Sequence, residues 1–205
     1  MSAGTIWNFE QCRKAITSLR GQLGFPDGPD LAVLRLHLDL STGALGTEPD
    51  GTPVPGIRPR VFCILDSYSR AKEVPETFRL ISFDKVPGGT AYAATFRQRA
   101  VRPLADMFGL DRKRFARVLE EFGAVPTAYA DHSWKLPALP RVPVYLLLWE
   151  GADEFPPSAN LLFDGSVSAY LETEAIAILG ELVTERIAFF MDDARFIPSY
   201  RDPVQ

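Results

Sequence analysis

The stretch Leu139-Pro-Arg-Val-Pro-Val-Tyr-Leu-Leu-Leu-Trp-Glu-Gly-Ala-Asp-Glu-Phe-Pro-Pro-Ser-Ala-Asn-Leu-Leu-Phe-Asp164 decides the fold more than any other part of the chain. Its first half, from Val142 to Trp149, is a continuous apolar run with the length of a buried strand. A second apolar run ends at Asp164. Between them lies an acidic loop stiffened by two prolines, with the residues Glu150, Asp153, Glu154, Pro156 and Pro157. This pattern predicts two strands joined by an acidic, restrained loop.

Segments on either side of this stretch predict helices and further strands. Leucines at 34, 36, 38 and 40 alternate with polar residues, which is typical of one half-buried strand. Phe78 and Leu80 indicate another strand. Apolar residues at helical spacing predict helices over 7–24, from Pro59 to Tyr68, from Asp111 to Gly123, and from Thr173 to Phe190. Pro103 predicts a kink or break in the helix that precedes it.

The order of these elements predicts the fold class. Helix, hairpin, helix, strand, several helices, two strands and a last helix follow one another without regular strand–helix alternation. This order favours an α+β fold with a mainly antiparallel or mixed sheet over a doubly wound fold. We expect one domain over 1–205, with an N-terminal helix and hairpin (1–58), a core (59–191) and a loosely held tail (192–205).

Composition and charge narrow the classes of partner. The 205 residues, 46% of them hydrophobic, are enough for a globular domain with a sizeable core. A formal net charge of −4 argues against nucleic acid or an anionic membrane as the main partner. The longest apolar run is far shorter than the about 20 residues of a membrane span. Two distant cysteines, Cys12 and Cys63, favour a reducing compartment, so we expect a cytoplasmic protein.

Four carboxylates form the first candidate site: Glu150, Asp153, Glu154 and Asp164. If the two apolar runs are neighbours in the sheet, these side chains could converge. Converging carboxylates bind hard cations or raise one another's pKa values for acid–base chemistry. The alternative is a solvated loop at the end of a strand, in which Asp164-Gly-Ser forms an ordinary turn.

Two further groups of residues are candidates for binding. Gly88, Gly89 and Thr90 precede a helix and could offer N–H groups to an anion, although a turn that requires a positive φ is the favoured explanation of the glycines. Five aromatic residues could line a pocket or anchor a loop: Tyr92, Phe96, Trp149, Phe155 and Phe163. Aromatic residues at helical spacing are also typical of a plain core.

The remaining polar residues give no catalytic or metal motif. His37 is expected at the surface. His132 is expected in an irregular segment, where it follows Asp131 in a run that is not a catalytic triad. Two histidines and two cysteines are too few to predict a transition-metal site. Seven basic residues lie in the middle of the chain: Arg97, Arg99, Arg102, Arg112, Lys113, Arg114 and Arg117. They fit the solvated faces of helices, or a surface that binds an acidic partner or a carboxylated ligand.

The chain resembles one family, the prokaryotic domain of unknown function numbered 3786. The resemblance rests on nine segments: Ile81-Ser-Phe83, Gly88-Gly89 with Tyr92, Pro103-Leu104, Phe108-Gly109, Pro140-Arg-Val-Pro143, Leu148-Trp-Glu150, Asp153-Glu-Phe-Pro156, Leu162-Phe-Asp164 and Tyr170-Leu171. It covers about 61–187 and implies a setting in anaerobic prokaryotes, near corrinoid or redox enzymes. Some members carry an added cysteine-rich iron–sulfur module, but this chain lacks the four close cysteines.

Three functions are therefore open. The first is a cytoplasmic accessory domain that binds a ligand or partner protein in corrinoid or redox metabolism, without catalysis of its own. The second is an acid–base or divalent-metal-assisted enzyme that uses the acidic loop 150–164. The third is a structural subunit of a larger complex. The sequence identifies no cofactor, ligand or oligomeric state.

Overall fold

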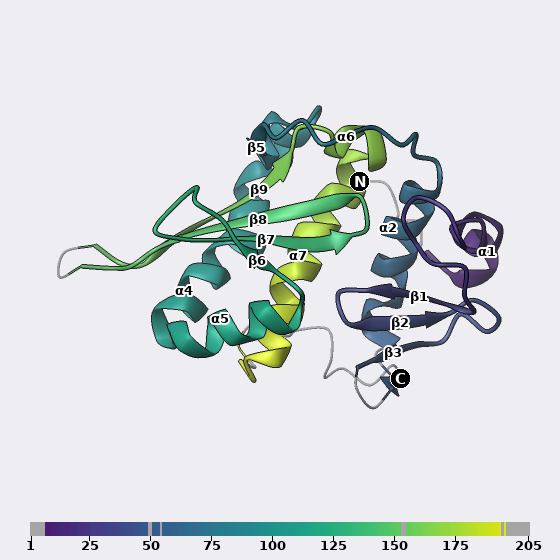
Figure 1. Cartoon of the computed structure of the whole chain (residues 1–205), viewed down its shortest axis with the longest axis horizontal. Coiled ribbons are helices and arrows are strands. Elements are labelled where there is room, and N and C mark those ends of the chain that lie inside the picture. The colour runs from purple at the N-terminus through teal and green to yellow at the C-terminus, as the bar shows by residue number, and fades with distance from the viewer. Residues whose placement is uncertain (1–6, 49–50, 54, 153–154, 194, 196–205) are drawn as a thin grey trace.

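Two antiparallel sheets with helices packed against them make up the structure, a computed structural model that describes residues 7–48, 51–53, 55–152, 155–193 and 195 (Figure 1). The strands are β1 (Asp30–Val33), β2 (Leu36–Asp39), β3 (Leu45–Thr47), β4 (Thr52–Pro53), β5 (Leu80–Ser82), β6 (Val125–Pro126), β7 (His132–Leu139), β8 (Val142–Trp149) and β9 (Ser158–Asp164). The α-helices are α1 (Phe9–Thr17), α2 (Arg58–Ser69), α3 (Ala93–Phe96), α4 (Arg102–Leu110), α5 (Arg112–Glu121), α6 (Val167–Tyr170) and α7 (Thr173–Phe190). The α+β prediction is confirmed.

The larger sheet has the order β5-β9-β8-β7-β6, with the predicted strand β8 at its centre. Seven of the eight residues of β8 are buried, so the strand is covered on both faces. Val144 and Leu146 face the main core, whereas Tyr145 points to the outer face beside the loops. The apolar run in the sequence is continuous because both faces of this strand are buried.

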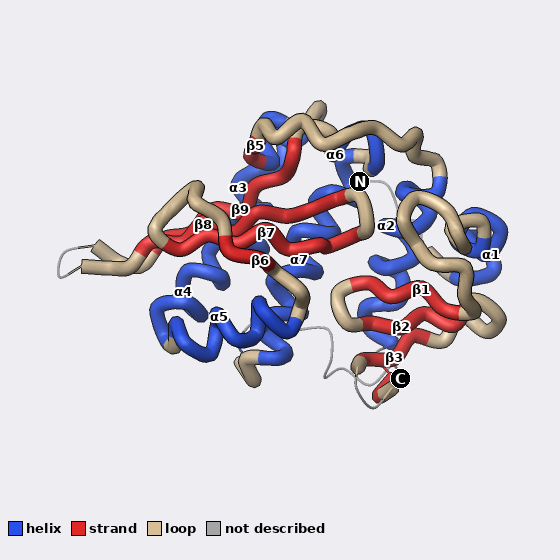
Figure 2. Tube along the Cα trace, viewed as in Figure 1, coloured by secondary structure: helices blue, strands red, loops and turns tan. Residues whose placement is uncertain are grey.

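The helix α7 lies against the inner face of this sheet and contacts most of the other helices. Twelve of the 18 residues of α7 are buried, and so are eight of the 12 residues of α2, which packs beside it. Both helices therefore lie in the interior of the protein. Together α2 and α7 join the larger sheet to the smaller sheet β1-β2-β3-β4, so that one core runs through the molecule (Figure 2).

The smaller sheet differs from the prediction at its first turn. The sequence predicts one strand over residues 34–40, but Leu34 and Arg35 form the two-residue turn of the β1–β2 hairpin. Both have positive φ, 50° and 58°, which is the geometry of a type I′ turn. That turn normally requires Asn or Gly, so the sequence contains no signal for it.

Arg186 of α7 holds this turn in place. Its side chain is completely buried, and its guanidinium donates hydrogen bonds to the carbonyl oxygens of Leu34 and Arg35, both at 3.0 Å. A third bond runs to Thr47 Oγ1 at 2.7 Å. The guanidinium carbon also lies 5.2 Å from the ring centroid of Phe190. A cation in the core thus fixes the smaller sheet onto α7.

Several helix boundaries follow the prediction and others do not. Asp111 caps α5 by accepting a hydrogen bond from the Arg114 N–H at 2.9 Å, and Pro59 lies in the first turn of α2, as predicted. The helix α1, however, ends at Thr17, where the Thr17 and Ser18 hydroxyls bond to helix carbonyls. Hydroxyl groups that compete in this way favour helix ends.

Two other predicted boundaries are wrong. Thr173 does not cap α7, because its hydroxyl donates to the Pro87 carbonyl at 2.6 Å instead. Phe78 lies outside β5, with a φ of 56° and 71% of its surface exposed. None of the helices in the described residues is long and apolar enough to cross a bilayer.

Candidate functional site

The antiparallel hairpin of β8 and β9 separates two of the four candidate carboxylates. Glu150 follows β8 at the end of the hairpin where Trp149 pairs with Ser158. Asp164 lies at the opposite end of β9, paired with Leu80 of β5. Six residues at about 3.3 Å each place these ends about 20 Å apart. The two carboxylates therefore do not converge, and the other two, at 153 and 154, lie outside the described residues.

Asp164 of β9 holds the loop that contains Thr77 against the larger sheet. Only 1% of its surface is exposed, and its Oδ1 accepts hydrogen bonds from the backbone and hydroxyl groups of both Thr77 and Ser166, at 2.6–3.0 Å. Burial raises the pKa of this carboxyl, but the hydrogen bonds outweigh it and leave the pKa below its usual value. The role that these contacts support is structural, and it agrees with the turn interpretation of Asp164-Gly-Ser.

Replacing Asp164 by asparagine is expected to lower the free energy of unfolding by about 1–3 kcal/mol, because Oδ2 is buried without a hydrogen-bond partner. An amide nitrogen in that place would lose its hydrogen bonds to water. The wild-type carboxylate stabilises the fold above its unfolded-state pKa of about 3.9, and this stabilisation is lost as the pH falls through the lower folded-state pKa. Urea unfolding from pH 7 to pH 3 measures both effects. The exposed Asp106→Asn is the control, and equal stability of the two variants would contradict the prediction.

The turn at Gly88 and Gly89 packs against and bonds to neighbouring residues of the same chain. Gly88 has a φ of 77°, and a Cβ at Gly89 would lie 2.1 Å from the Phe83 carbonyl oxygen. The Gly89 N–H already donates to the Val86 carbonyl at 2.8 Å, and the Thr90 hydroxyl bonds to Asp84 O at 3.2 Å. The glycines are thus required by backbone geometry.

The five candidate aromatic residues divide between the core and the surface. Phe163 and Phe96 are buried, and the Phe96 ring stacks on that of Phe83 with centroids 4.4 Å apart. Tyr92 and Trp149 are half-buried. Phe155, with 72% of its surface exposed, does not anchor the acidic loop, but it lines the pocket described next.

A pocket of about 590 Å³ lies where the acidic loop meets the end of α4. We call it the tip pocket; it is lined by Phe108, Gly109, Arg112, Glu150, Gly151, Ala152, Phe155, Pro156 and Pro157. Glu150 Oε1 accepts a hydrogen bond from His132 Nε2 at 2.9 Å and forms an ion pair with Arg112. These contacts, the histidine bond first, hold the pKa of Glu150 below its usual value. The pocket therefore contains a histidine–carboxylate pair next to a guanidinium.

Aromatic rings fix the histidine of this pair. Phe108 lies 5.1 Å from the His132 ring between centroids, and Trp134 stacks parallel to it at 6.4 Å. Sequence reasoning placed His132 in an irregular segment, but it begins β7 opposite Leu148. The alternation of His132 and Trp134 with Ser133 and Lys135 was the available signal for a strand.

A second pocket, of about 460 Å³, continues along the same helix. We call it the arginine pocket; it is lined by Ala94, Arg97, Gln98, Val101, Arg102, Ala105, Pro157, Ser158 and Ala159. Pro157 separates the two pockets, because the absence of a side chain at Gly109 lets the proline ring pack against α4, where a Cβ would lie only 2.6 Å from it. The described lining of the arginine pocket includes two arginines and no acidic side chain.

The two arginines project from an irregular part of the helix. Residues Arg97–Val101 form a π turn, in which the Arg102 N–H bonds to the Arg97 carbonyl. Pro103 follows directly and has no N–H to donate, which explains why the irregularity lies just before it, as predicted. The Thr184 hydroxyl of α7 bonds to the Ala100 carbonyl at 2.7 Å and so supports the π turn from the core.

The cysteines lie away from both pockets. Cys12 and Cys63 are buried and free, and burial raises the pKa of the Cys63 thiol to about 12. A buried thiol of this kind is a poor nucleophile. Among the described residues, no group of three or more His, Cys, Asp or Glu side chains could hold a metal ion.

Comparison with known proteins leads to one family. No curated protein and no solved structure matches the sequence. The model of one protein family matches residues 56–186, which is more than half of the chain and includes the lining of both pockets. The chain belongs to the family described as Domain of unknown function (DUF3786).

Proposed function

We propose that this protein is a non-catalytic accessory domain that binds an anionic ligand or partner protein along the arginine pocket. The observation that carries the proposal concerns the exposure and the bonding of the Arg97 and Arg102 side chains. Both side chains are exposed at the rim of an apolar hollow, and neither has a hydrogen bond or ion pair within the part of the chain that the structure describes. By contrast, Arg99 and Arg112 nearby each face a carboxylate.

The chemistry of the pocket suits a ligand with both a charge and an apolar part. A guanidinium offers a planar set of donors that matches a carboxylate or phosphate with two hydrogen bonds. Val101, Ala105 and Pro157 provide apolar surface beside these donors. Because the whole chain carries a net charge of −4, this basic hollow is a local exception that would favour an anion over a cation.

The proposed metabolic context comes from the family resemblance, and the proposed cellular location comes from the cysteines. The family resemblance is what supports a binding role in the corrinoid or redox metabolism of an anaerobe. Free, buried Cys12 and Cys63 are consistent with a cytoplasmic location. Catalysis by the acidic loop is less well supported, since Glu150 is already neutralised by Arg112 and lies at the other end of the hairpin from Asp164.

Binding of the apolar anion anilinonaphthalene sulfonate tests the proposal. We expect its fluorescence to rise on addition of the wild-type protein. Replacing both Arg97 and Arg102 by glutamine should weaken binding by at least about tenfold, because charge-assisted hydrogen bonds are worth about 1.5–3 kcal/mol each. Fluorescence titration gives the dissociation constants, and thermal unfolding shows that each variant is folded.

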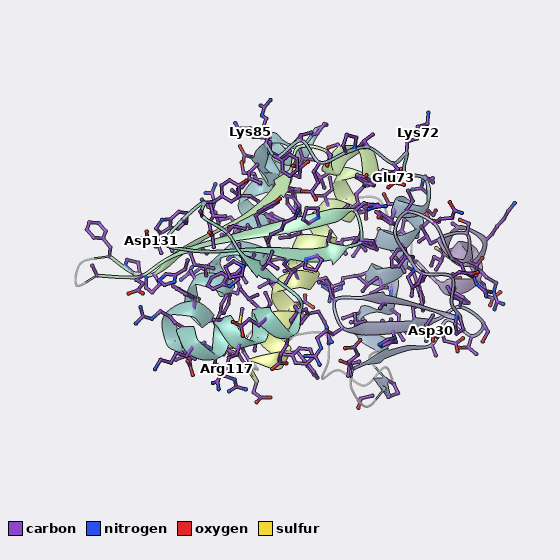
Figure 3. All side chains as sticks on the ribbon, viewed as in Figure 1. Asp30, Lys72, Glu73, Lys85, Arg117 and Asp131 are labelled. Atoms are coloured by element: carbon purple, nitrogen blue, oxygen red, sulfur yellow. The ribbon has the colours of Figure 1, made fainter. Side chains whose placement is uncertain are left out.

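Arg117→Gln is the matched control for this experiment. Arg117 lies on α5, is exposed, and lines neither pocket (Figure 3). Its replacement removes one positive charge without touching the arginine pocket. Equal binding by the wild type and the double glutamine variant would exclude the proposed site, as would an equal loss in the Arg117 variant.

A further inference from the structure

One edge of β9 is left open beside the arginine pocket. The strand β5 pairs only with Leu162–Asp164, whereas β8 pairs with β9 from Ser158 onward. The stretch Ser158–Leu161 therefore has β8 on one side and no strand on the other among the described residues (Figure 2). An open edge of this kind presents a row of backbone N–H and C=O groups that can pair with another strand.

The first two residues of the open edge line the same pocket as the two arginines. Ser158 and Ala159 form one wall of the arginine pocket, and the helix that carries Arg97 and Arg102 forms the other. Contacts between β9 and this helix keep the two walls together. Backbone pairing groups, apolar surface and positive charge thus line one short channel.

We propose that the occupant of this channel is an extended acidic segment of a partner protein, which adds to the larger sheet as a strand alongside Ser158–Leu161. This inference rests on the proposed function and names its partner class. Main-chain hydrogen bonds to the open edge provide the affinity in this mode of recognition, and alternate side chains provide specificity. Acidic side chains of the segment would meet Arg97 and Arg102, while apolar ones would cover Val101 and Ala105.

The limits of the open edge set the length of the segment. Pro157 precedes it and cannot donate to a strand, and β5 occupies the remainder of β9. Four residues at about 3.3 Å each give a channel of about 13 Å. A small anion would bind the arginines but would leave this row of backbone groups unpaired. Measuring whether the bound molecule pairs with these groups therefore distinguishes a small anion from an added strand.

The probe is a fluorescein-labelled peptide of six residues in which glutamate and valine alternate. Two further versions carry backbone N-methyl groups on every second residue, one version for each alternate set, because an N-methyl group removes the donor and blocks pairing. We expect the unmodified peptide to bind the full chain in anisotropy titrations. One methylated version should bind at least about tenfold more weakly, and the other should bind nearly as well as the unmodified peptide.

Amide hydrogen exchange adds a second measurement. Strand addition should slow exchange in Ser158–Leu161 when the peptide is present, and the variant with glutamine at 97 and 102 should lose this protection. If both methylated versions bind as tightly as the unmodified peptide, strand addition is wrong although binding in the pocket stands. If neither the peptide nor anilinonaphthalene sulfonate binds, the proposed function fails as well. Equal weakening by Arg117→Gln would also overturn the inference.

Discussion

Replacing Arg186 by methionine is expected to lower the free energy of unfolding by about 3–5 kcal/mol, because three buried hydrogen bonds from its guanidinium are lost and their acceptors are left without these donors. Methionine fills a similar volume but donates no hydrogen bond. The carbonyl oxygens of Leu34 and Arg35 would then lose their guanidinium donors in the interior, at about 1–3 kcal/mol each. Chemical denaturation with urea measures the loss.

The same change is expected to act first on the smaller sheet. Leu34 and Arg35 adopt positive φ values that cost about 1–2 kcal/mol for ordinary side chains, and Arg186 helps to offset that cost. Hydrogen exchange should therefore speed up in β1–β3 before it does in β7–β9. The exposed Arg117→Met should change stability by no more than about 0.5 kcal/mol. A loss below about 1 kcal/mol in the Arg186 variant would show that the turn does not depend on this guanidinium.

The hairpin turn also shows why parts of the fold could not be predicted from the sequence. Strands β8 and β9 are predicted correctly because their apolar runs are strand-sized and separated by prolines. The β1–β2 turn is missed because leucine alternation continues through it and because neither Gly nor Asn marks it. Its geometry is fixed by Arg186, 152 positions from Leu34, which is a tertiary contact without a local signal.

Part of the candidate site can likewise be predicted from the sequence, and part of it cannot. The acidic loop and the basic helix segment are visible in the sequence, and both border the pockets. The pairing of Glu150 with His132 and Arg112 depends on the register of β7 against β8 and on where α4 ends. Neither of these can be read from local patterns, since strand register and helix packing are set by the whole core. The separation of Glu150 from Asp164 likewise follows from strand direction.

Replacing Gly180 by alanine is expected to destabilise the protein by about 1–3 kcal/mol, although the same change in an exposed helix would stabilise it by about 1 kcal/mol. Gly180 lies in the middle of α7, where a Cβ would be 2.5 Å from Phe96 Cε2 and 3.5 Å from Phe163 Cζ. The Phe96 ring cannot simply move aside, because it stacks on Phe83 and also contacts the tilted ring of Phe163. Overpacking therefore outweighs the gain in helix propensity.

A double-mutant cycle with Phe96→Leu separates these two effects. Leucine at 96 is smaller and leaves space for the methyl group that Gly180→Ala introduces, so the double variant should be more stable than the sum of the two single changes predicts, by about 0.5–3 kcal/mol. Glu174→Ala, on the exposed face of the same helix, should stay within about 0.5 kcal/mol of the wild type. Urea unfolding of the four proteins of the cycle provides the measurement. Strict additivity, or a more stable Gly180→Ala single variant, would mean that α7 and the Phe96 ring are not in close contact.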